Sequence, residues 1–150
     1  MGKFIWILGL FLVSLAPMAV QAGPGEDANA VVDRWSSAYS SNEPDTIAKV
    51  YATDAILLGT VSPVISVGTD AILKYFSALK GSGNKNAIQE RHTIVLGDDA
   101  VVVTGFYEFS GVTEGKPWAR PSRFTMLLSK RGGEWHIAHH HSSPRVLPKT

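Results

Sequence analysis

The stretch that decides the fold is Arg123–Ser143, which reads RFTMLLSKRGGEWHIAHHHSS. Two β-prone runs flank a Gly-Gly pair, which is the pattern of a β-hairpin. The second run places three of the five histidines of the chain in consecutive positions, His139, His140 and His141. Because side chains alternate between the faces of a strand, we expect His139 and His141 on one face and His140 on the other, toward solvent or a subunit interface. Imidazoles exchange protons and bind anions or metals near neutral pH, so this hairpin is the first place to expect a site.

The same alternation places His139 and His141 with Trp135 and Ile137, which look like core residues. We therefore predict that both imidazoles point inward. One interpretation is a polar end to an apolar pocket, which binds a carboxylate or moves a proton. The other is a structural role, in which the imidazoles hydrogen-bond to neighbours and fix the end of the strand.

Arg123 is the natural counter-charge for an acidic ligand, because its guanidinium fork matches a carboxylate. The hairpin register decides where it points. An even-length loop puts Phe124, Met126 and Leu128 on the face of His139 and His141, and an odd loop or a bulge puts Arg123 and Thr125 there. A surface or interface ion pair is the alternative role for Arg123.

The first 22 residues have the pattern of a secretory signal peptide. Lys3 supplies the positive start, Phe4–Leu15 is a nearly unbroken apolar run, and Val20–Ala22 resembles a cleavage site. The apolar run is too short for a membrane-spanning helix. We expect an exported, periplasmic or secreted, chain that starts at Gly23 and leaves the membrane after cleavage; an uncleaved anchor is the alternative.

Composition limits the class of protein further. The chain has 14 Lys and Arg and 13 Asp and Glu, so removal of Lys3 with the leader brings the formal charge to zero. The basic residues are scattered and form no stripe, so we expect no nucleic-acid partner. An exported chain without cysteine has no disulfide framework, and its hydrophobic core must hold the fold alone.

The N-terminal half predicts three helices. Residues 26–41 carry apolar side chains at three- and four-residue spacings, a short second helix begins at Pro44, and a third runs from a Thr69 cap to Gly81. Residues 54–58 predict a short strand between the second and third helices. The expected inner faces of the helices are Val31, Val32, Trp35, Ala38 and Tyr39, then Ile47, Val50 and Tyr51, then Ile72, Leu73, Phe76 and Leu79.

The C-terminal half changes to a period of two. Residues 87–96 and 100–109 predict strands on either side of a Gly-Asp-Asp turn, and the hairpin described above completes an antiparallel meander. Helices first and strands after indicate an α+β domain with its helices on one face of a curved sheet.

Several motifs in this order resemble the nuclear-transport-factor-2-like, or SnoaL-like, superfamily, and within it the branch of the calcium/calmodulin-dependent protein kinase II association domain. The likeness covers essentially all of residues 23–150, and its last motif is the most specific. The matching pieces are Tyr51–Ala55, Leu57–Thr60, Gly105–Phe109, Pro121–Phe124, and Gly133–Ile137 running into His140–Ser143.

The resemblance implies a cone-shaped, cystatin-like α+β barrel with a pocket between helices and sheet, assembled into dimers or larger rings. It does not imply a kinase, because the chain has no Gly-rich nucleotide loop and no catalytic Asp loop. In the eukaryotic hub an Arg directly follows the His-x-His pair, whereas Ser142 stands there in this chain. The ligand preferences of the hub are therefore not transferred to it.

The sequence gives less support to two other site chemistries. A zinc site on the His-x-His pair needs a third ligand from His92, Glu90 or Asp54, none of which has a recognisable spacing, so we expect no metal and no cofactor. The superfamily resemblance also marks Asp54, since isomerases and dehydratases of this kind use an acid. An Asp just before the first strand more often caps or pairs.

The sequence therefore favours an exported, oligomeric small-molecule-binding domain without kinase activity, whose partner is a second copy of itself. Arg123, His139, His141 and Tyr51 are the candidate pocket residues, and the ligand is expected to be acidic or amphipathic. The alternatives are a cofactor-independent isomerase, dehydratase or hydrolase with a pocket histidine as general base, and a purely structural oligomerisation domain. The catalytic residues of such an enzyme are unknown.

Overall fold

The computed structural model describes residues 22–148 of the 150-residue chain. The predicted signal peptide, residues 1–22, lies outside the described residues apart from Ala22. Within residues 22–148, no helix combines the length and the apolar character needed to cross a membrane.

Three helices form where the apolar stripes predict them. Helix α1 spans Pro24–Ser41, α2 spans Pro44–Ala48, and α3 spans Gly68–Phe76 and continues into a single 3-10 turn, η1, at Ser77–Leu79. Proline opens α1 and α2, since its fixed φ and missing N–H suit the first turn of a helix. No side-chain hydrogen bond caps α3, which begins one residue before Thr69, so the predicted Thr69 cap is wrong.

Six strands form one curved sheet that does not close into a barrel. Its strand order is β2-β1-β6-β5-β4-β3, and all neighbours are antiparallel except β1 and β6, which are parallel. The predicted α+β class and meander are confirmed. The strand bounds are β1 Tyr51–Leu58, β2 Ile65–Val67, β3 Lys85–Val95, β4 Ala100–Thr113, β5 Lys116–Arg131 and β6 Glu134–Pro144.

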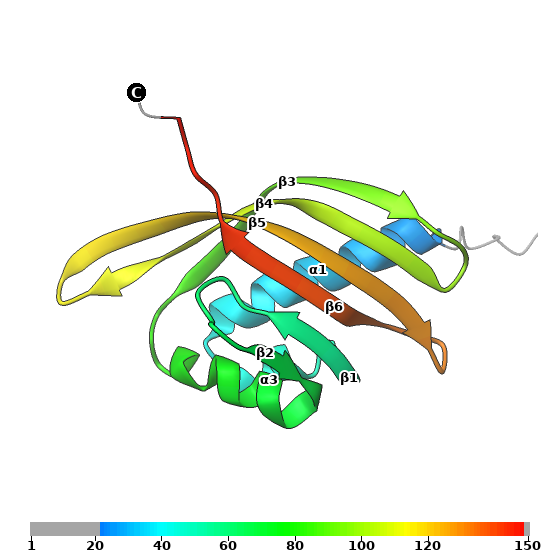
Figure 1. The fold of residues 1–150 in the computed structure, drawn as a ribbon, viewed down its shortest axis with the longest axis horizontal. Helices are drawn as coiled ribbons and strands as arrows, with labels where there is room; N and C mark the ends of the chain where they lie inside the picture. Colours follow the sequence, from blue (N-terminus) through cyan, green and yellow to red (C-terminus); the bar gives the residue numbers. More distant parts are fainter. Residues whose placement is uncertain (1–21, 149–150) are drawn as a thin grey trace, which may run out of the picture.

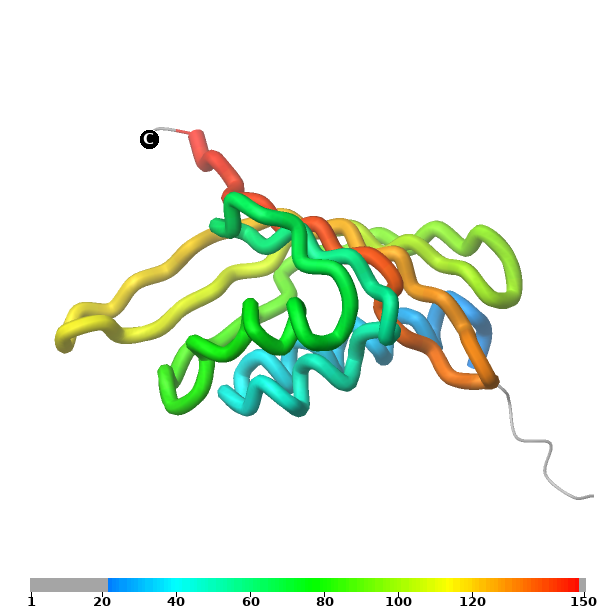
Figure 2. Tube along the Cα trace, turned by 60° about the horizontal axis from the view of Figure 1, so that its bottom comes forward, coloured from blue at the N-terminus to red at the C-terminus, as the bar shows by residue number. Residues whose placement is uncertain are grey.

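The hydrophobic core lies between the helices and one face of the sheet, which we call the inner face (Figure 2). The opposite face, the outer face, has none of the helices of residues 22–148 packed on it. Burial of large apolar side chains on one face only is what holds a sheet of this kind to its helices. The largest fully buried side chains are Trp35, Ile47, Leu57, Ile72, Tyr107, Phe124, Met126, Leu128, Ile137 and His140.

A β-bulge in β6 reverses the predicted orientation of the histidines. Leu128 pairs with Ile137 and Leu127 pairs with His139, so Ala138 is an extra residue without a partner in β5. Ile137 and His140 are therefore both buried on the inner face, while His141 is exposed on the outer face. The prediction that His139 and His141 point inward and His140 outward is wrong, because strict alternation does not hold across a bulge.

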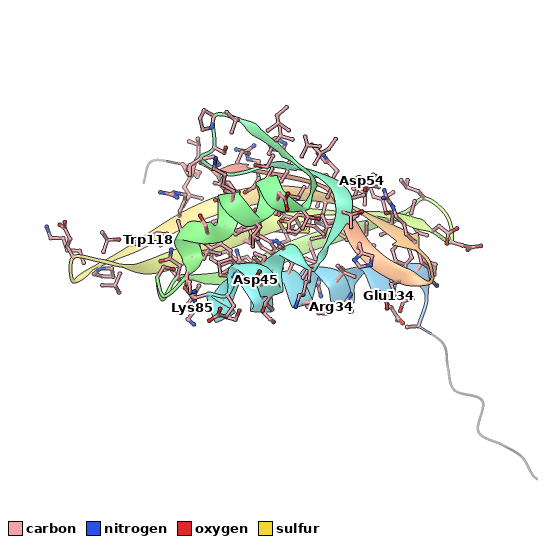
Figure 3. All side chains as sticks on the ribbon, turned by 90° about the horizontal axis from the view of Figure 1, so that it is seen from below. Arg34, Asp45, Asp54, Lys85, Trp118 and Glu134 are labelled. Atoms are coloured by element: carbon pink, nitrogen blue, oxygen red, sulfur yellow. The ribbon has the colours of Figure 1, made fainter. Side chains whose placement is uncertain are left out.

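Strands β4 and β5 run on beyond the rest of the sheet as a projecting hairpin, Ser110–Arg120, which we call the arm (Figure 1). Its turn uses Glu114 and Gly115, both at positive φ. Trp118, at the base of the arm, packs back against the core (Figure 3). The period-two pattern does not predict the arm, because glycine and proline interrupt it.

Candidate functional site

The inner face carries a pocket of about 100 Å³ where α1 and α3 meet the sheet near the base of the arm. Its walls are mostly aromatic, and its inner end is polar, formed by Thr60, His140 and Ser142. Such a combination of apolar walls with a few convergent polar groups is typical of a small-molecule site. The aromatic wall residues are Trp35, Tyr39, Tyr75, Phe76, Tyr107 and Phe109.

Sequence spacing explains how the walls converge. Trp35 and Tyr39 are four residues apart on α1, so both face the sheet, and their ring centroids lie 5.8 Å apart. Tyr107 and Phe109 alternate with outward residues on β4, and the Tyr107 ring stacks on Trp35 at 5.6 Å. The Trp35 ring also meets the imidazole of His140 edge-on, at 5.0 Å and 90°.

Hydrogen bonds join five buried side chains in one line through His140. Trp35 Nε1 donates to the Tyr51 hydroxyl at 2.8 Å, and this hydroxyl lies 2.8 Å from His140 Nδ1. On the other side of the ring, His140 Nε2 lies 3.2 Å from the Tyr107 hydroxyl, which donates to Ser142 Oγ. Ser142 Oγ in turn contacts the hydroxyl of Thr60 at the end of the pocket.

The direction of this hydrogen-bond line follows from its first member. An indole N–H donates only, so the Tyr51 hydroxyl accepts from Trp35 and gives its own proton to Nδ1 of His140. The neutral ring then carries its proton on Nε2 and donates to Tyr107, whose proton goes to Ser142. A hydroxyl proton therefore remains at the Thr60 and Ser142 end, where it faces the pocket.

Burial keeps the whole line uncharged. The pKa of His140 falls from its usual value to about 3, first because the ring is fully buried and second because His139 and His141 lie nearby. Burial raises the pKa of Tyr51 and Tyr107 well above the ordinary tyrosine value. Since no member carries charge near neutral pH, the pocket interior presents hydrogen-bonding groups without a formal charge.

Arg120 supplies the one cationic side chain among the described residues that line this pocket. It lies in the arm, and its guanidinium stacks over the Trp118 ring at 5.5 Å. The Trp118 ring is close to Gly111 on the neighbouring strand, where a side chain would collide with it. Among residues 22–148 Arg120 makes no ion pair with an acidic residue, so its charge is available to a ligand.

The four candidate residues predicted from the sequence lie on opposite faces of the sheet. Tyr51 is buried and holds His140 from behind, without lining the pocket itself. Arg123 and His141 lie on the outer face around a separate hollow of about 300 Å³. His139 follows the outer-face register as well. The bulge thus places Arg123 and Thr125 on the face of His141, which is one of the two registers left open by the sequence.

The sequence does not predict four polar residues of the pocket, namely Thr60, Arg120, His140 and Ser142. His140 is missed because the bulge cannot be seen in the sequence. Arg120 has a usable signal: Phe124, Ser122 and Arg120 alternate on one face of β5, so a buried Phe124 places Arg120 toward the inner side.

The acids and the remaining histidine weighed for catalysis or metal binding lie elsewhere. Asp54 is exposed, forms an ion pair with Arg131 and is not among the residues that line the pocket; Figure 3 shows it well apart from Trp118. Glu90 pairs with His92 on the outer face, with 3.0 Å between Oε1 and Nε2. Among residues 22–148, no three or more His, Cys, Asp or Glu side chains are arranged to hold a metal ion.

A family model and a solved structure both match this chain to the same association domain. The family model of the calcium/calmodulin dependent protein kinase II association domain matches residues 25–146. A solved structure from Xanthomonas campestris, assigned to the same association domain, is 31% identical, with a TM-score of 0.76 over 91% of this chain and 97% of that one. No curated protein matches the chain.

More distant solved structures share the fold. An NTF2-like protein with a cystatin-like fold from Novosphingobium aromaticivorans is 14% identical, with a TM-score of 0.70 over 81% of each chain. A ketosteroid isomerase-like protein from Erwinia carotovora atroseptica is 18% identical, with a TM-score of 0.69 over 82% of this chain and 97% of that one. The nuclear-transport-factor-2-like resemblance is thereby confirmed at the level of the fold.

The hydrogen-bond line predicts one tautomer for His140. Nitrogen-15 NMR of the imidazole should show a bare Nδ1 and a protonated Nε2, and this pattern should persist from pH 7 down to pH 4 because the pKa is about 3. A His140 ring that carries its proton on Nδ1, or that becomes doubly protonated between pH 7 and pH 4, would contradict the arrangement.

The contribution of His140 to the free energy of unfolding should rise with pH between about 3 and 6.5. In that window the unfolded chain binds a proton on this histidine and the folded chain does not, so the contribution of neutral His140 is complete above pH 6.5 and is lost toward pH 3. The slope from this residue approaches about 1.4 kcal/mol per pH unit. Urea unfolding of wild type and His140→Phe at pH 4 and pH 7 measures it. If the free energy of unfolding depends on pH equally in wild type and in His140→Phe, the low pKa of His140 is contradicted.

Proposed function

The chain belongs to the calcium/calmodulin dependent protein kinase II association domain family, and we propose that it is an oligomeric, non-catalytic module that holds a small organic acid in the inner-face pocket. One observation carries the proposal: a single cation, Arg120, stands beside an uncharged, aromatic-walled interior that ends in hydroxyl groups. No kinase activity is part of it.

An organic acid fits this arrangement in one orientation. Its carboxylate meets the guanidinium of Arg120, because the fork of an arginine accepts two carboxylate oxygens at once. Its apolar body lies among the aromatic walls, where burial and ring contacts stabilise it. A hydrogen-bond acceptor at its far end receives the proton left at Thr60 and Ser142. A pocket of about 100 Å³ limits the ligand to a small molecule.

The geometry supports binding over base catalysis. A general base needs a free nitrogen and a pKa near the working pH, whereas both nitrogens of His140 face tyrosine hydroxyls and its pKa is about 3. None of the described residues that line the pocket is an Asp or a Glu. The ketosteroid isomerase-like protein therefore shares its fold with this chain, and we transfer no catalytic step from it.

Self-association through the outer face is the second part of the proposal. The family is named for association, and the outer face carries exposed apolar side chains that a monomer rarely leaves in water. Among them, Ile56 is 40% exposed, Ile94 is 53% exposed and Val67 is 59% exposed. The occupant that we propose for this face is a second copy of the chain.

Export is the third part, and it rests on the leader pattern alone. A positive start, a short apolar run and a small-residue cleavage site support delivery to the periplasm or the medium. Removal of the leader releases the chain from the membrane.

Benzoate and its neutral isostere benzamide test the pocket chemistry by titration calorimetry. Wild type should bind benzoate at least tenfold more tightly than benzamide, since only the carboxylate uses the charge of Arg120. In Arg120→Met the two probes should bind with similar affinity. The matched control Arg123→Met, on the outer face, should keep the preference of the wild type.

Two results of the titrations would reject the proposed ligand class. One is a benzoate preference that survives in Arg120→Met and disappears in Arg123→Met, because the anion site would then lie on the outer face. The other is an absence of benzoate binding to wild type at millimolar concentration, with a correctly folded protein confirmed by circular dichroism.

Native mass spectrometry of the wild type, expressed with its own leader and purified from the exported fraction, tests self-association and export together. We expect a dimer or a larger ring of chains that each begin at Gly23. A bare monomer at micromolar concentration would reject self-association, and a chain that retains Lys3 would reject cleavage of the leader.

A further inference from the structure

A groove follows the arm outward from the inner-face pocket. Its volume is about 660 Å³, and it is lined by both strands of the arm and by the loop before β3. Arg120 lines the groove as well as the pocket, so the two cavities adjoin at this side chain. A ligand whose carboxylate binds Arg120 therefore has room to continue along the arm.

The inner end of the groove depends on Gly111. A side chain at this position would collide with the Trp118 ring of β5 and with the amide of Asn84 in the loop before β3. Both of these side chains line the groove, and the Trp118 ring lies 5.5 Å from the guanidinium of Arg120. A flat ring and a polar amide thus stand beside the cation, close over the backbone of β4.

One edge of the arm lacks a strand partner. The register of β3 with β4 ends at the pair Lys85–Ser110, so no strand of residues 22–148 pairs with Val112 on that side. Val112 lines the groove and is 61% exposed. A free strand edge presents backbone N–H and C=O groups that another extended chain can use.

The hydrogen-bond pattern of the arm directs the backbone of Val112 toward this free edge. The Pro121 carbonyl accepts from the Arg145 N–H on the side away from β4, so Pro121 and its β4 partner Glu108 exchange no hydrogen bonds. Bonded and non-bonded pairs alternate along an antiparallel ladder, and the register of β4 with β5 has no shift over the arm. Val112 and Pro117 are therefore also a non-bonded pair, and the N–H and C=O of Val112 point out of the arm.

The groove carries one charge at each end. Arg120 lies at the base of the arm and Glu114 at its turn, and among residues 22–148 neither forms an ion pair. Lys116, which is next to the turn, does not line the groove. From Ser110 to Glu114 the chain runs about 14 Å at about 3.4 Å per residue, which is the length of about four extended residues.

We propose that the arm groove and the inner-face pocket together bind a short peptide with a free C-terminus and an aromatic last residue. This inference rests on the proposed organic-acid site and names the acid. The C-terminal carboxylate binds Arg120, and the last side chain enters the aromatic pocket. The backbone then runs antiparallel to β4 and exchanges hydrogen bonds with Val112, and the N-terminal ammonium lies near Glu114.

A peptide uses groups that a simple aromatic acid leaves without a partner. Such an acid reaches Arg120 and the aromatic walls, but it brings no N–H and C=O for Val112 and no cation for Glu114. The direction of the peptide follows from the charges, because the cation of the groove lies at the base of the arm and its carboxylate at the turn.

Titration calorimetry with two probes tests the extension along the arm. Wild type should bind the tetrapeptide Gly-Gly-Gly-Phe at least tenfold more tightly than 3-phenylpropanoate, because the peptide adds two backbone hydrogen bonds and one ion pair. The C-terminal amide of the same peptide should bind at least tenfold more weakly than the free acid, since it has no charge for Arg120.

Val112→Pro tests the pairing with β4. It removes the outward N–H and no hydrogen bond to β5, because Val112 and Pro117 are a non-bonded pair. The variant should lose the tenfold gain of the peptide and keep the wild-type affinity for 3-phenylpropanoate. The matched control Val112→Ala shortens the side chain but keeps the N–H, and it should retain the gain.

N-methylated peptides give the same test on the unaltered protein. One methyl group is placed on each backbone amide nitrogen in turn, and methylation at the residue that pairs with Val112 should reproduce the loss seen in Val112→Pro. A sensitivity confined to one position is expected, because a single residue of β4 faces the peptide with its backbone groups.

The outcomes separate this inference from the proposed function. Equal affinity of wild type for the peptide and 3-phenylpropanoate, with benzoate still preferred over benzamide, would overturn the peptide and leave the organic-acid site in place. A peptide gain that survives both Val112→Pro and methylation at every amide would overturn the pairing with β4. Failure of wild type to bind the peptide, 3-phenylpropanoate and benzoate would overturn both proposals.

Discussion

The arrangement of this protein depends on one extra residue in its last strand. Ala138 has no partner in β5, and the bulge that it forms turns Ile137 and His140 onto the same buried face. The imidazole of His140 thereby reaches the hydroxyls of Tyr51 on β1 and Tyr107 on β4, and it joins the two halves of the sheet to Trp35 of α1. Without that one-residue shift, the hydroxyls of Tyr51 and Tyr107 would lose the imidazole that connects them. Buried hydroxyls without a hydrogen-bond partner would lower the stability of the fold.

The bulge also separates two surfaces with different chemistry. The inner face ends in a neutral line of hydrogen bonds whose direction is set by the indole N–H of Trp35, with the charge of Arg120 nearby. The outer face receives His139, His141 and Arg123, together with exposed apolar side chains. The proposed ligand site and the proposed interface are therefore built from opposite sides of the same strands. Substitutions on one side are expected to leave the function of the other side intact.

The sequence predicts the fold well and the site only in part. Apolar stripes such as Trp35 and Ala38 in α1, or Ile72 and Phe76 in α3, depend on local periodicity and are confirmed. The orientation of His140 depends on a bulge, which is a property of the pairing between two strands and leaves no mark in either one. Arg120 lies in an arm where glycine and proline break the alternating pattern. The family resemblance predicts the fold and not the ligand, because Ser142 stands where the hub has an arginine.

The most direct test of the account is a crystal structure of residues 23–150 that resolves the side chains of β6. The account predicts that Ala138 forms a bulge and that the His140 ring lies between the hydroxyls of Tyr51 and Tyr107, with His139 and His141 on the opposite face. A regular β6, with His139 and His141 packed beside Trp35 and His140 in solvent, would contradict it.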